Sequence, residues 1–251
     1  MKIYDTLLIG SCYSAVGYAL ANKNTLIVEE NEMADTRFYM PLKNYATSQY
    51  QPNTEYGKKL LDCFNSLGLI QNNLINANGL ECAFCDFLSQ VNLDMIFKSR
   101  VIKTDKENDH FCSQIITNSG IITVKSKQII DTRVTNAKKC CLTVLLKGNL
   151  TKTDHQTLEE VFINSHIENT LYTDVYALFL EQPCNIEYNA ILTDFFQKWK
   201  KVGINAKVLY LAPIVACVCE NQEGFPKDEY FDNPVKALES GYFFYKKEAN
   251  I

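Results

Sequence analysis

The sequence predicts an α/β fold, with a parallel strand–helix–strand unit near its start, a hairpin in the middle of the chain and a second part built of longer strands. Three observations lead to this prediction. A strand, a glycine turn, a helix and a second strand follow one another within Tyr4–Glu30. A hairpin signal at Asn118-Ser119-Gly120 separates two β-branched segments. From Cys141 onward the pattern changes to longer strands that one amphipathic helix interrupts.

The composition is that of a globular protein, and it excludes several classes of function. Of the 251 residues, 47% are hydrophobic and 22% are charged, which suffices to bury a core. The net charge of -4 leaves no basic excess for a nucleic-acid partner. No apolar stretch reaches the roughly 18 to 20 residues that span a bilayer, and no cleavable leader is recognisable. We therefore expect a cytoplasmic protein without a membrane span. Most of its ten cysteines are expected to be unpaired, with no disulfide framework.

The opening strand–helix–strand unit is predicted from three short segments. Tyr4–Ile9 is an apolar run that ends at Gly10, which is typical of a buried parallel strand. Ser14–Ala21 carries small and apolar residues suited to a tightly packed helix, and Thr25–Val28 is a second β-branched run. The right-handed crossover between the two strands makes them parallel.

The middle of the chain predicts two helices followed by a series of short strands. Thr54–Leu67 and Leu80–Gln90 each place apolar residues on one helical face. Asn31–Asn53 shows no clear periodicity and is predicted to be irregular. The expected strands are Leu93–Phe97, Val101–Thr104, Phe111–Thr117, Ile121–Val124 and Gln128–Asp131.

The remainder of the chain predicts longer strands and two helices. An amphipathic helix is expected at Tyr188–Val202, with Gly203 as its C-cap. Asn233 followed by Pro234 marks the start of a final helix, because asparagine is a good N-cap and proline favours the first helical position. The expected strands are Cys141–Leu146, Glu159–Ile163, Val175–Glu181 and Val208–Val218.

A weakened glycine signature follows the first strand. A dinucleotide-binding turn needs glycine first for the tight turn, glycine second for backbone approach to the pyrophosphate, and glycine or alanine third for helix packing. Gly10 and Ala15 meet the first and third requirements, whereas Cys12 occupies the second position. A side chain there pushes a diphosphate outward or weakens its binding. The residues predicted to hold the pyrophosphate are Gly10, Ser11, Cys12, Tyr13, Ser14 and Ala15.

An acidic residue stands where a dinucleotide-binding unit needs one. Glu29 ends the second strand and is predicted to accept a hydrogen bond from a ribose 2′-hydroxyl, with Glu30 as the next candidate. A negative charge there disfavours a 2′-phosphate, so we do not expect an NADP-type ligand. The alternative is a strand–helix–strand unit whose turn binds nothing.

The order of these segments resembles that of the FAD-dependent oxidoreductases of the two-dinucleotide-binding-fold, glutathione-reductase-like superfamily. The stretches that carry the resemblance are Tyr4–Glu30, Leu93–Asp131 and Asn233–Tyr245. The resemblance implies a Rossmann-like FAD-binding domain with a parallel sheet and a β-meander, plus a smaller mixed-sheet, substrate-type lobe. The implied boundaries are 1–140 and 206–251 for the FAD-binding domain and 141–205 for the inserted lobe.

One departure makes the chain a divergent relative of this superfamily. In the family the strand that returns toward the flavin usually ends in a D-A-T-G-like sequence. In this chain it ends in Asp131-Thr132-Arg133, so the acid and the threonine are recognisable and the glycine is absent. The resemblance implies that Asp131 contacts the cofactor and that the helix beginning at Asn233 presents its N-terminus to the flavin.

The cofactor that the resemblance implies is FAD, and the implied reaction is hydride transfer between a small-molecule substrate and the flavin. Because only one glycine fingerprint is visible, electrons would come from a substrate, a transiently bound nicotinamide or a protein redox partner. In the family the region corresponding to Asn31–Gln51 runs close to the flavin ring, which makes Arg37 and Tyr39 candidates for catalysis. The alternative for that region is a surface loop anchored by aromatic residues. Assembly into an oligomer is left open.

Other functions also remain open. A non-catalytic relative would keep the fold, lose tight cofactor binding and act as a partner subunit or binding module, consistent with Cys12 and Arg133 at glycine positions. A Rossmann-fold methyltransferase also uses a glycine turn and an acid, but the hairpin block argues against it. Cys82 and Cys85 have C-x-x-C spacing, which is compatible with a redox dithiol, half of a metal site or buried thiols on an amphipathic helix. We expect the last of these, and no metal site.

Overall fold

The computed structural model describes residues 2–34, 45–46, 50–133, 139–183, 185–212, 215–218, 225–226 and 233–249. Contacts divide these residues into two compact units. The first unit holds the described residues up to 133 and those from 225 onward, and the second holds those from 139 to 218. The second unit includes the strand that begins at residue 206, a position from which the resemblance implies a return to the first domain.

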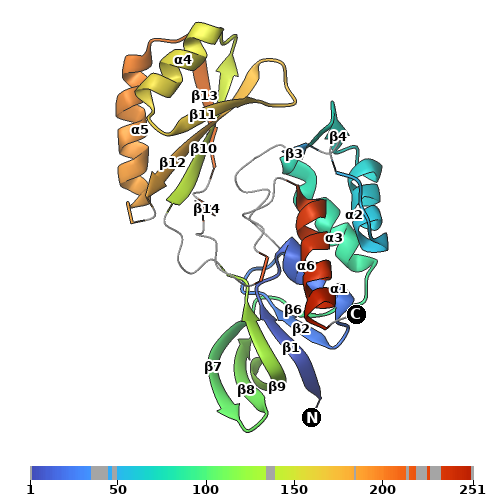
Figure 1. The fold of residues 1–251 in the computed structure, drawn as a ribbon. Coiled ribbons are helices and arrows are strands. Elements are labelled where there is room, and N and C mark those ends of the chain that lie inside the picture. The colour runs from blue at the N-terminus through green and yellow to red at the C-terminus, as the bar shows by residue number, and fades with distance from the viewer. Residues whose placement is uncertain are drawn as a thin grey trace. The chain divides into compact units, whose positions relative to one another are not determined.

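The first unit is built on a six-stranded sheet with the order β6-β2-β1-β9-β8-β7 (Figure 1). Its strands are β1 (Ile3–Ile9), β2 (Thr25–Val28), β6 (Asp94–Ile96), β7 (Arg100–Glu107), β8 (His110–Thr117) and β9 (Gly120–Asp131). The strands β6, β2, β1 and β9 run parallel, and β9, β8 and β7 continue the sheet as an antiparallel meander. The predicted combination of a parallel sheet with a β-meander is confirmed.

The strand β9 belongs to both parts of this sheet. Residues 120–126 pair with β8, and residues 125–131 run along β1. The sequence pattern predicts two separate strands here, Ile121–Val124 and Gln128–Asp131. The polar residues between them stay extended because their backbone pairs with a neighbouring strand, a long-range interaction that the side-chain pattern does not reveal.

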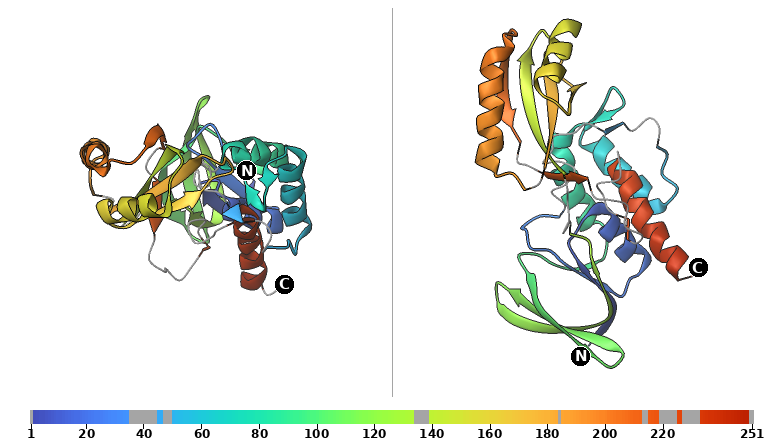
Figure 2. Two further views of the ribbon diagram at one scale, coloured as in Figure 1. Left: turned by 90° about the horizontal axis from the view of Figure 1, so that it is seen from above. Right: turned by 60° about the vertical axis from the view of Figure 1, so that its left-hand side comes forward.

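The helices of the first unit gather on one side of the sheet (Figure 1 and Figure 2). They are α1 (Tyr13–Ala21), α2 (Glu55–Ser66), α3 (Leu80–Ser89) and α6 (Pro234–Glu248), with a short 3-10 helix η1 (Ala77–Gly79) before α3. A small sheet that the sequence pattern does not predict consists of β3 (Tyr45–Ala46), β5 (Leu74–Ile75) and β4 (Ile70–Gln71). Its two-residue strands are too short to produce a periodic signal.

Helices α1 and α6 pack closely because glycine stands at their contact. A Cβ atom at Gly17 would come within 2.8 Å of the Leu238 carbonyl carbon, and one at Gly241 within 2.6 Å of the Ser14 carbonyl carbon. Real Cβ atoms do not approach backbone so closely, so both positions require glycine at this helix separation. The contact fixes α6 against the helix that follows the Gly10 turn.

A buried carboxylate joins α6 to the start of α2. Glu239 is fully buried, and it accepts hydrogen bonds from the backbone N–H groups of Asn53 (2.8 Å) and Thr54 (2.5 Å). The Thr54 hydroxyl (2.7 Å) and the Tyr50 phenol donate to the same carboxylate. Burial and the hydrogen bond to Glu239 raise the pKa of Tyr50, which keeps the phenol protonated as a donor. The negative charge also lies at the N-terminus of α2, where the helix dipole favours it.

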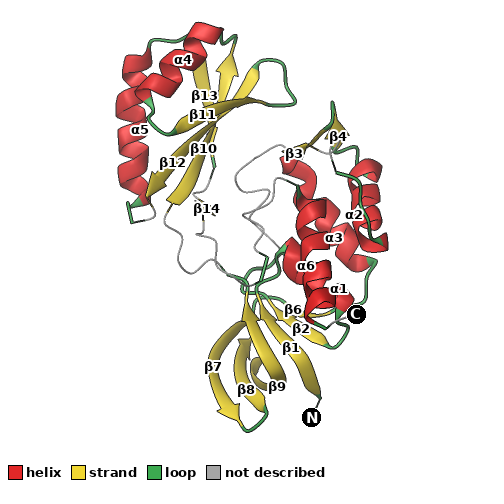
Figure 3. Cartoon of the chain, viewed as in Figure 1, coloured by secondary structure: helices red, strands yellow, loops and turns green. Residues whose placement is uncertain are grey.

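The second unit contains a sheet ordered β11-β12-β10-β13, in which β14 also pairs with β10. Its strands are β10 (Lys139–Gly148), β11 (Ser165–Asn169), β12 (Val175–Pro183), β13 (Ala206–Leu211) and β14 (Val215–Val218), and its helices are α4 (Lys152–Val161) and α5 (Tyr188–Val202) (Figure 3). The pairings described in this sheet are antiparallel. Leu142, Leu178 and Phe195 belong to the core that the strands and helices enclose.

The helix α4 corrects one prediction. The sequence pattern predicts a strand at Glu159–Ile163, but the residues up to Val161 are helical. The helix begins at a capping box, in which the Thr151 hydroxyl accepts from the Asp154 N–H (3.2 Å) and the Asp154 carboxylate accepts from the Thr151 N–H (2.7 Å). Because Leu158 is buried in the core of this unit, the apolar residues here are the inner face and the end of a helix.

The other helix predictions are confirmed to within one residue at each predicted end. At the end of α5, Gly203 has a φ of 69°, the left-handed conformation expected of a glycine C-cap. Among the residues described, no helix combines the length and the apolar content needed to cross a membrane.

Candidate functional site

The candidate site lies at the carboxyl edge of the parallel strands, where ligands bind to sheets of this kind. Ile9 at the end of β1 pairs with Val28 of β2 on one side and with Asp131 of β9 on the other. The three strands therefore end at one level. The residues that follow these strands are neighbours, although they come from three distant parts of the sequence.

The turn after β1 requires glycine at residue 10, as the sequence analysis predicts. Gly10 has a φ of 99°, and its N–H donates to the Val28 carbonyl at 2.9 Å. A Cβ atom at this position would come within 2.6 Å of the Thr132 hydroxyl oxygen. That hydroxyl is held in place, because it and the Thr132 N–H both donate to the Ile9 carbonyl at 2.9 Å. Any side chain at residue 10 would be strained and would collide with the segment after β9.

The residues between Gly10 and α1 are enclosed by the protein. The remaining residues predicted to hold a pyrophosphate are each at most 2% exposed, namely Ser11, Cys12, Tyr13, Ser14 and Ala15. The Cys12 thiol lies 3.3 Å from the Ser14 hydroxyl, and the Tyr13 ring stacks on Phe84 with the ring centroids 3.9 Å apart. Cys12 thus adds a buried side chain at the position where a dinucleotide-binding turn has its second glycine.

Glu29, the predicted ribose ligand, is bound on both oxygens by the protein itself. One oxygen accepts hydrogen bonds from the Ser11 N–H (2.9 Å) and the Ser11 hydroxyl (2.7 Å). The other accepts from the Asn31 N–H (2.9 Å) and the Asn31 side-chain amide (2.8 Å). A carboxylate offers about four lone-pair directions for hydrogen bonds, so the bonds from Ser11 and Asn31 together use the accepting capacity of Glu29. In this arrangement Glu29 joins the glycine turn to the segment after β2.

A second charged network crosses the same edge. The Arg133 guanidinium donates to both oxygens of Asp131, through Nε at 2.9 Å and Nη2 at 2.7 Å, and it reaches Glu30 through Nη1 at 2.5 Å. The Nε atom of Arg100 lies 3.6 Å from the same Glu30 oxygen. The hydrogen bonds to Asp131 raise the pKa of Arg133 above its usual value. Glu30 and Asp131, both predicted to contact the cofactor, are therefore joined by one cation.

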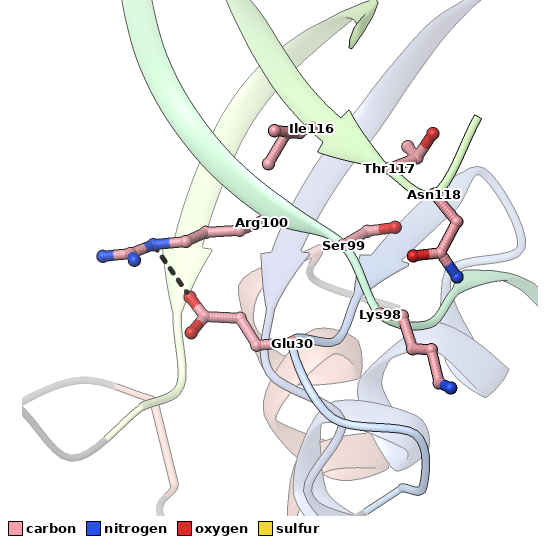
Figure 4. A pocket seen from close by; sticks show the side chains of 7 residues that line it. All are labelled: Glu30, Lys98, Ser99, Arg100, Ile116, Thr117 and Asn118. Carbon is pink, nitrogen blue, oxygen red and sulfur yellow. Dashed lines mark ion pairs between the residues drawn. The ribbon is translucent and has the colours of Figure 1, made fainter. Parts of the chain in front are cut away.

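A pocket of about 370 Å³ opens beside Glu30 (Figure 4). Its lining comes from the segment after β2, the connection from β6 to the first residue of β7, and the end of β8 with the residue that follows it. The lining residues are Glu30, Lys98, Ser99, Arg100, Ile116, Thr117 and Asn118. The side chains of Arg100 and Glu30 form an ion pair on one side, and Lys98 extends away from them (Figure 4). This mixture of charges, hydroxyls and an amide suits a polar ligand that both donates and accepts hydrogen bonds.

Three further predicted site residues are Asn233, Arg37 and Tyr39. Asn233 caps α6, and its side-chain oxygen accepts from the N–H groups of Val235 (2.9 Å) and Lys236 (3.2 Å). Arg37 and Tyr39 lie outside the described residues, so their role in catalysis stays a prediction.

The C-x-x-C pair lies on the outer side of α3. Cys82 and Cys85 are both exposed, which corrects the prediction of buried thiols. Phe84 and Phe87 form the buried face of the helix, because aromatic rings bury more apolar area than thiols do. Partial burial and the nearby Glu81 carboxylate raise the pKa of Cys85, which opposes formation of a reactive thiolate.

Sequence reasoning missed two residues of this edge. Asn31 lies in a segment without periodicity, and the sequence pattern shows Arg133 only as the loss of a glycine. The available signal is charge, since Glu29, Glu30 and Asp131 stand at the carboxyl ends of β2 and β9, the two strands that flank β1. Like charges gathered at one edge of a sheet repel each other, so a cation is needed close by. Arg133 is the nearest basic residue in the sequence to Asp131.

No protein-family model matches the sequence, and no curated protein matches it. Solved structures do match the fold. A p-nitrophenol 4-monooxygenase from Pseudomonas putida DLL-E4 gives a TM-score of 0.55 over 99% of this chain and 79% of its own, at 12% identity. A geranylgeranyl bacteriochlorophyll reductase-like protein from Thermoplasma acidophilum gives 0.57 over 100% and 80%, at 13% identity. Aklavinone-11 hydroxylase, solved with FAD and aklavinone, gives 0.52 over 99% and 64%, at 10% identity. At these identities the similarity establishes the fold.

Proposed function

We propose that this chain is an FAD-binding oxidoreductase-like protein, with the dinucleotide lying across the carboxyl edge of β1, β2 and β9. The observation that carries the proposal is the left-handed Gly10 turn at the end of an inner parallel strand, beside two acids at the end of the next strand. The fold supports this choice of ligand, because the chain shares it over 99% of its length with a hydroxylase that was solved with FAD.

The diphosphate of such a ligand would meet complementary charge at this edge. A diphosphate is an anion, and the N-terminus of α1 and the Arg133 guanidinium both offer it complementary charge. Cys12 keeps the backbone of the turn from approaching a phosphate as closely as a glycine would. We therefore expect the diphosphate to lie outward of the turn, toward Arg133.

The ribose half requires an exchange of partners. Both oxygens of Glu29 already accept hydrogen bonds, from Ser11 on one side and from Asn31 on the other. Ser11 is buried in the turn, whereas Asn31 is exposed. The Asn31 side-chain amide is thus the donor that a ribose hydroxyl can replace. Glu29 would then hold the turn with one oxygen and the ribose with the other.

The proposed reaction is hydride transfer with a small-molecule substrate, and the flavin supplies hydride acceptance when bound. The residues of the chain would bind the cofactor and orient it. Glu29 fixes the turn through Ser11, Arg133 would balance the charge of the diphosphate, and the N-terminus of α1 follows directly after the turn at the same sheet edge. The electrons come from the substrate, a transient nicotinamide or a protein redox partner.

The absorption spectrum of the protein purified without added cofactor tests this proposal. Absorption bands at about 450 and 370 nm are expected, either at once or after reconstitution with FAD. A colourless protein that cannot be reconstituted would refute the proposal. Cys12→Gly is expected to tighten FAD binding, because it lets the backbone approach the diphosphate. Cys112→Ala is the matched control, since it removes a thiol from β8 and should leave the affinity unchanged.

A second candidate function is that of a non-catalytic relative, a partner subunit or binding module. The satisfied Glu29 carboxylate and the enclosed turn favour it, because both describe an edge that is complete without a ligand. Thermal unfolding distinguishes the two candidates. Saturating FAD raises the melting temperature of a protein that binds it and leaves that of a non-binding relative unchanged.

A further inference from the structure

The side chain of Arg133 lies across the end of β1. In the sheet β1 stands between β9 and β2, so a contact from the segment after β9 to the segment after β2 passes over the carboxyl end of β1. Arg133 makes this contact with Glu30 at 2.5 Å. The stem of its side chain passes Gly10, since a Cβ atom there would be 3.4 Å from Arg133 Cγ. The guanidinium therefore lies over the turn at which a dinucleotide would cross the sheet.

The charges around Arg133 can be rearranged to accept an anion. Two carboxylates, Glu30 and Asp131, face two guanidinium groups, Arg133 and Arg100, so the cluster carries no net charge. A diphosphate at the turn adds negative charge and competes for Arg133. Glu30 can release it without losing all its partners, because Arg100 Nε already lies 3.6 Å from the same oxygen. Asp131 meanwhile holds the Arg133 N–H at 3.0 Å and keeps its backbone in place.

We propose that Arg133 is a diphosphate-binding residue, held over the turn by Glu30 and Asp131 until a ligand phosphate takes the place of Glu30. The class of ligand, a nucleoside diphosphate or a dinucleotide, rests on the proposed function. The role of Arg133 rests on its position over Gly10 and on its side chain, which is 39% exposed and thus accessible. A guanidinium binds phosphate through two parallel hydrogen bonds and extends outward from the backbone. It can therefore replace contacts that Cys12 denies to the backbone of the turn.

The test compares ADP with adenosine, two probes that differ by the diphosphate alone. Isothermal titration calorimetry at fixed salt is expected to show that Arg133→Ala weakens ADP binding about 10- to 100-fold, the loss of a charge-assisted hydrogen bond. Adenosine binding should not change, which also shows that the variant is folded. Arg133→Lys keeps the charge without the paired geometry, so its ADP affinity should be intermediate. Lys103→Ala is the control, since it removes a cation of β7 that pairs with Asp105 at 2.6 Å.

A double-mutant cycle tests the exchange of partners. Glu30→Gln releases Arg133 from its carboxylate and should tighten ADP binding several-fold. If the gain acts through Arg133, it disappears when Glu30→Gln is combined with Arg133→Ala. A gain that persists in the double variant reflects general repulsion between Glu30 and the anion, and it contradicts the exchange.

The outcomes separate this inference from the proposed function. A wild-type protein that binds neither ADP nor FAD overturns both. Tight FAD and ADP binding that Arg133→Ala leaves unchanged, or strengthens, overturns the role of Arg133 and leaves the proposed function standing. ADP affinity that falls in Arg133→Ala and partly returns in Arg133→Lys, with adenosine affinity constant, supports the inference.

Discussion

The Glu239 carboxylate offers a direct measure of what joins α6 to α2. Glu239→Gln keeps the size of the side chain and removes its charge. In the native arrangement the carboxylate accepts from the Asn53 N–H, from the Thr54 N–H and hydroxyl, and from the Tyr50 phenol. An amide has a single accepting oxygen, and its NH2 group faces further donors. At least one buried donor therefore loses its partner, and the others lose the charge that strengthens their bonds.

The expected size of the effect follows from these contacts. A hydrogen bond to a charged group contributes about 1.5–3 kcal/mol, and one between neutral groups about 0.5–1.5 kcal/mol. Weakening three bonds by about 1 kcal/mol each and orphaning one donor amounts to about 4–6 kcal/mol. Removal of a buried charge offsets several kcal/mol of this, because its desolvation penalty disappears. We expect Glu239→Gln to lower the free energy of unfolding of the first unit by about 2 kcal/mol.

The assay must follow the first unit by itself. Hydrogen exchange at the Thr54 and Gly57 amides, measured across a urea series, reports the start of α2, whereas far-UV circular dichroism follows both units together. The single tryptophan, Trp199, lies on α5 and reports the second unit, whose transition should not move.

Glu55→Gln is the matched control for this experiment. Glu55 begins the same helix, but its side chain is 76% exposed and pairs with Lys59 at 3.1 Å. Its replacement should change stability by less than about 0.5 kcal/mol. If Glu239→Gln is no more destabilising than Glu55→Gln, the buried carboxylate does not hold the two helices together and the reasoning is wrong.

Two further predictions concern other contacts. Gly241→Ala places a Cβ within 2.6 Å of the Ser14 carbonyl carbon, so it should destabilise the first unit by about 2 kcal/mol in urea unfolding, despite the better helix propensity of alanine. Hydrogen bonds from Thr151, first from its N–H and then from its hydroxyl, lower the pKa of Asp154. Its contribution to stability is therefore present above the unfolded pKa of about 3.9 and is lost as the pH falls through the lower folded value. Asp154→Ala should accordingly lower the stability of the second unit near pH 7, and the difference should fade toward about pH 2, by Trp199 fluorescence.

Each of these two predictions has a clear contrary result. A Gly241→Ala variant as stable as the wild type would mean that α1 and α6 separate at little cost. A stability difference for Asp154→Ala that stays constant down to low pH would mean that the side chain acts through packing, and the capping bonds would then contribute nothing.

The sequence predicts the opening strand–helix–strand unit because its signals are local. The apolar runs and the glycine between them define β1, the turn and β2 without information from elsewhere in the chain. The same holds for α6, whose cap Asn233 and first residue Pro234 are adjacent. The helix α4 shows the limit of such reasoning. Its capping residues are equally local, but the apolar residues Val161, Phe162 and Ile163 at its end imitate a strand.

The position of the candidate site could be predicted, but its contents could not. Gly10 and Glu29 locate the carboxyl edge from spacing alone. The contact between Glu30 and Arg133 joins residues 103 positions apart, and it follows from the strand order β2-β1-β9. That order is set by backbone pairing over long distances, which a one-dimensional pattern does not encode. The hydrogen bonds from Asn31 to the Glu29 carboxylate depend likewise on how an aperiodic segment folds.

The shared strand β9 has a consequence for recombination, both in evolution and in the laboratory. The meander is not a detachable module, because residues 125–131 are also an inner strand of the parallel sheet. A chimera that imported a foreign meander would replace that inner strand and would shift Thr132, on which the Gly10 turn rests. Inserted loops or tags are best tolerated at the two hairpin tips, at Asn108 and Ser119. Both residues are exposed and lie between strands.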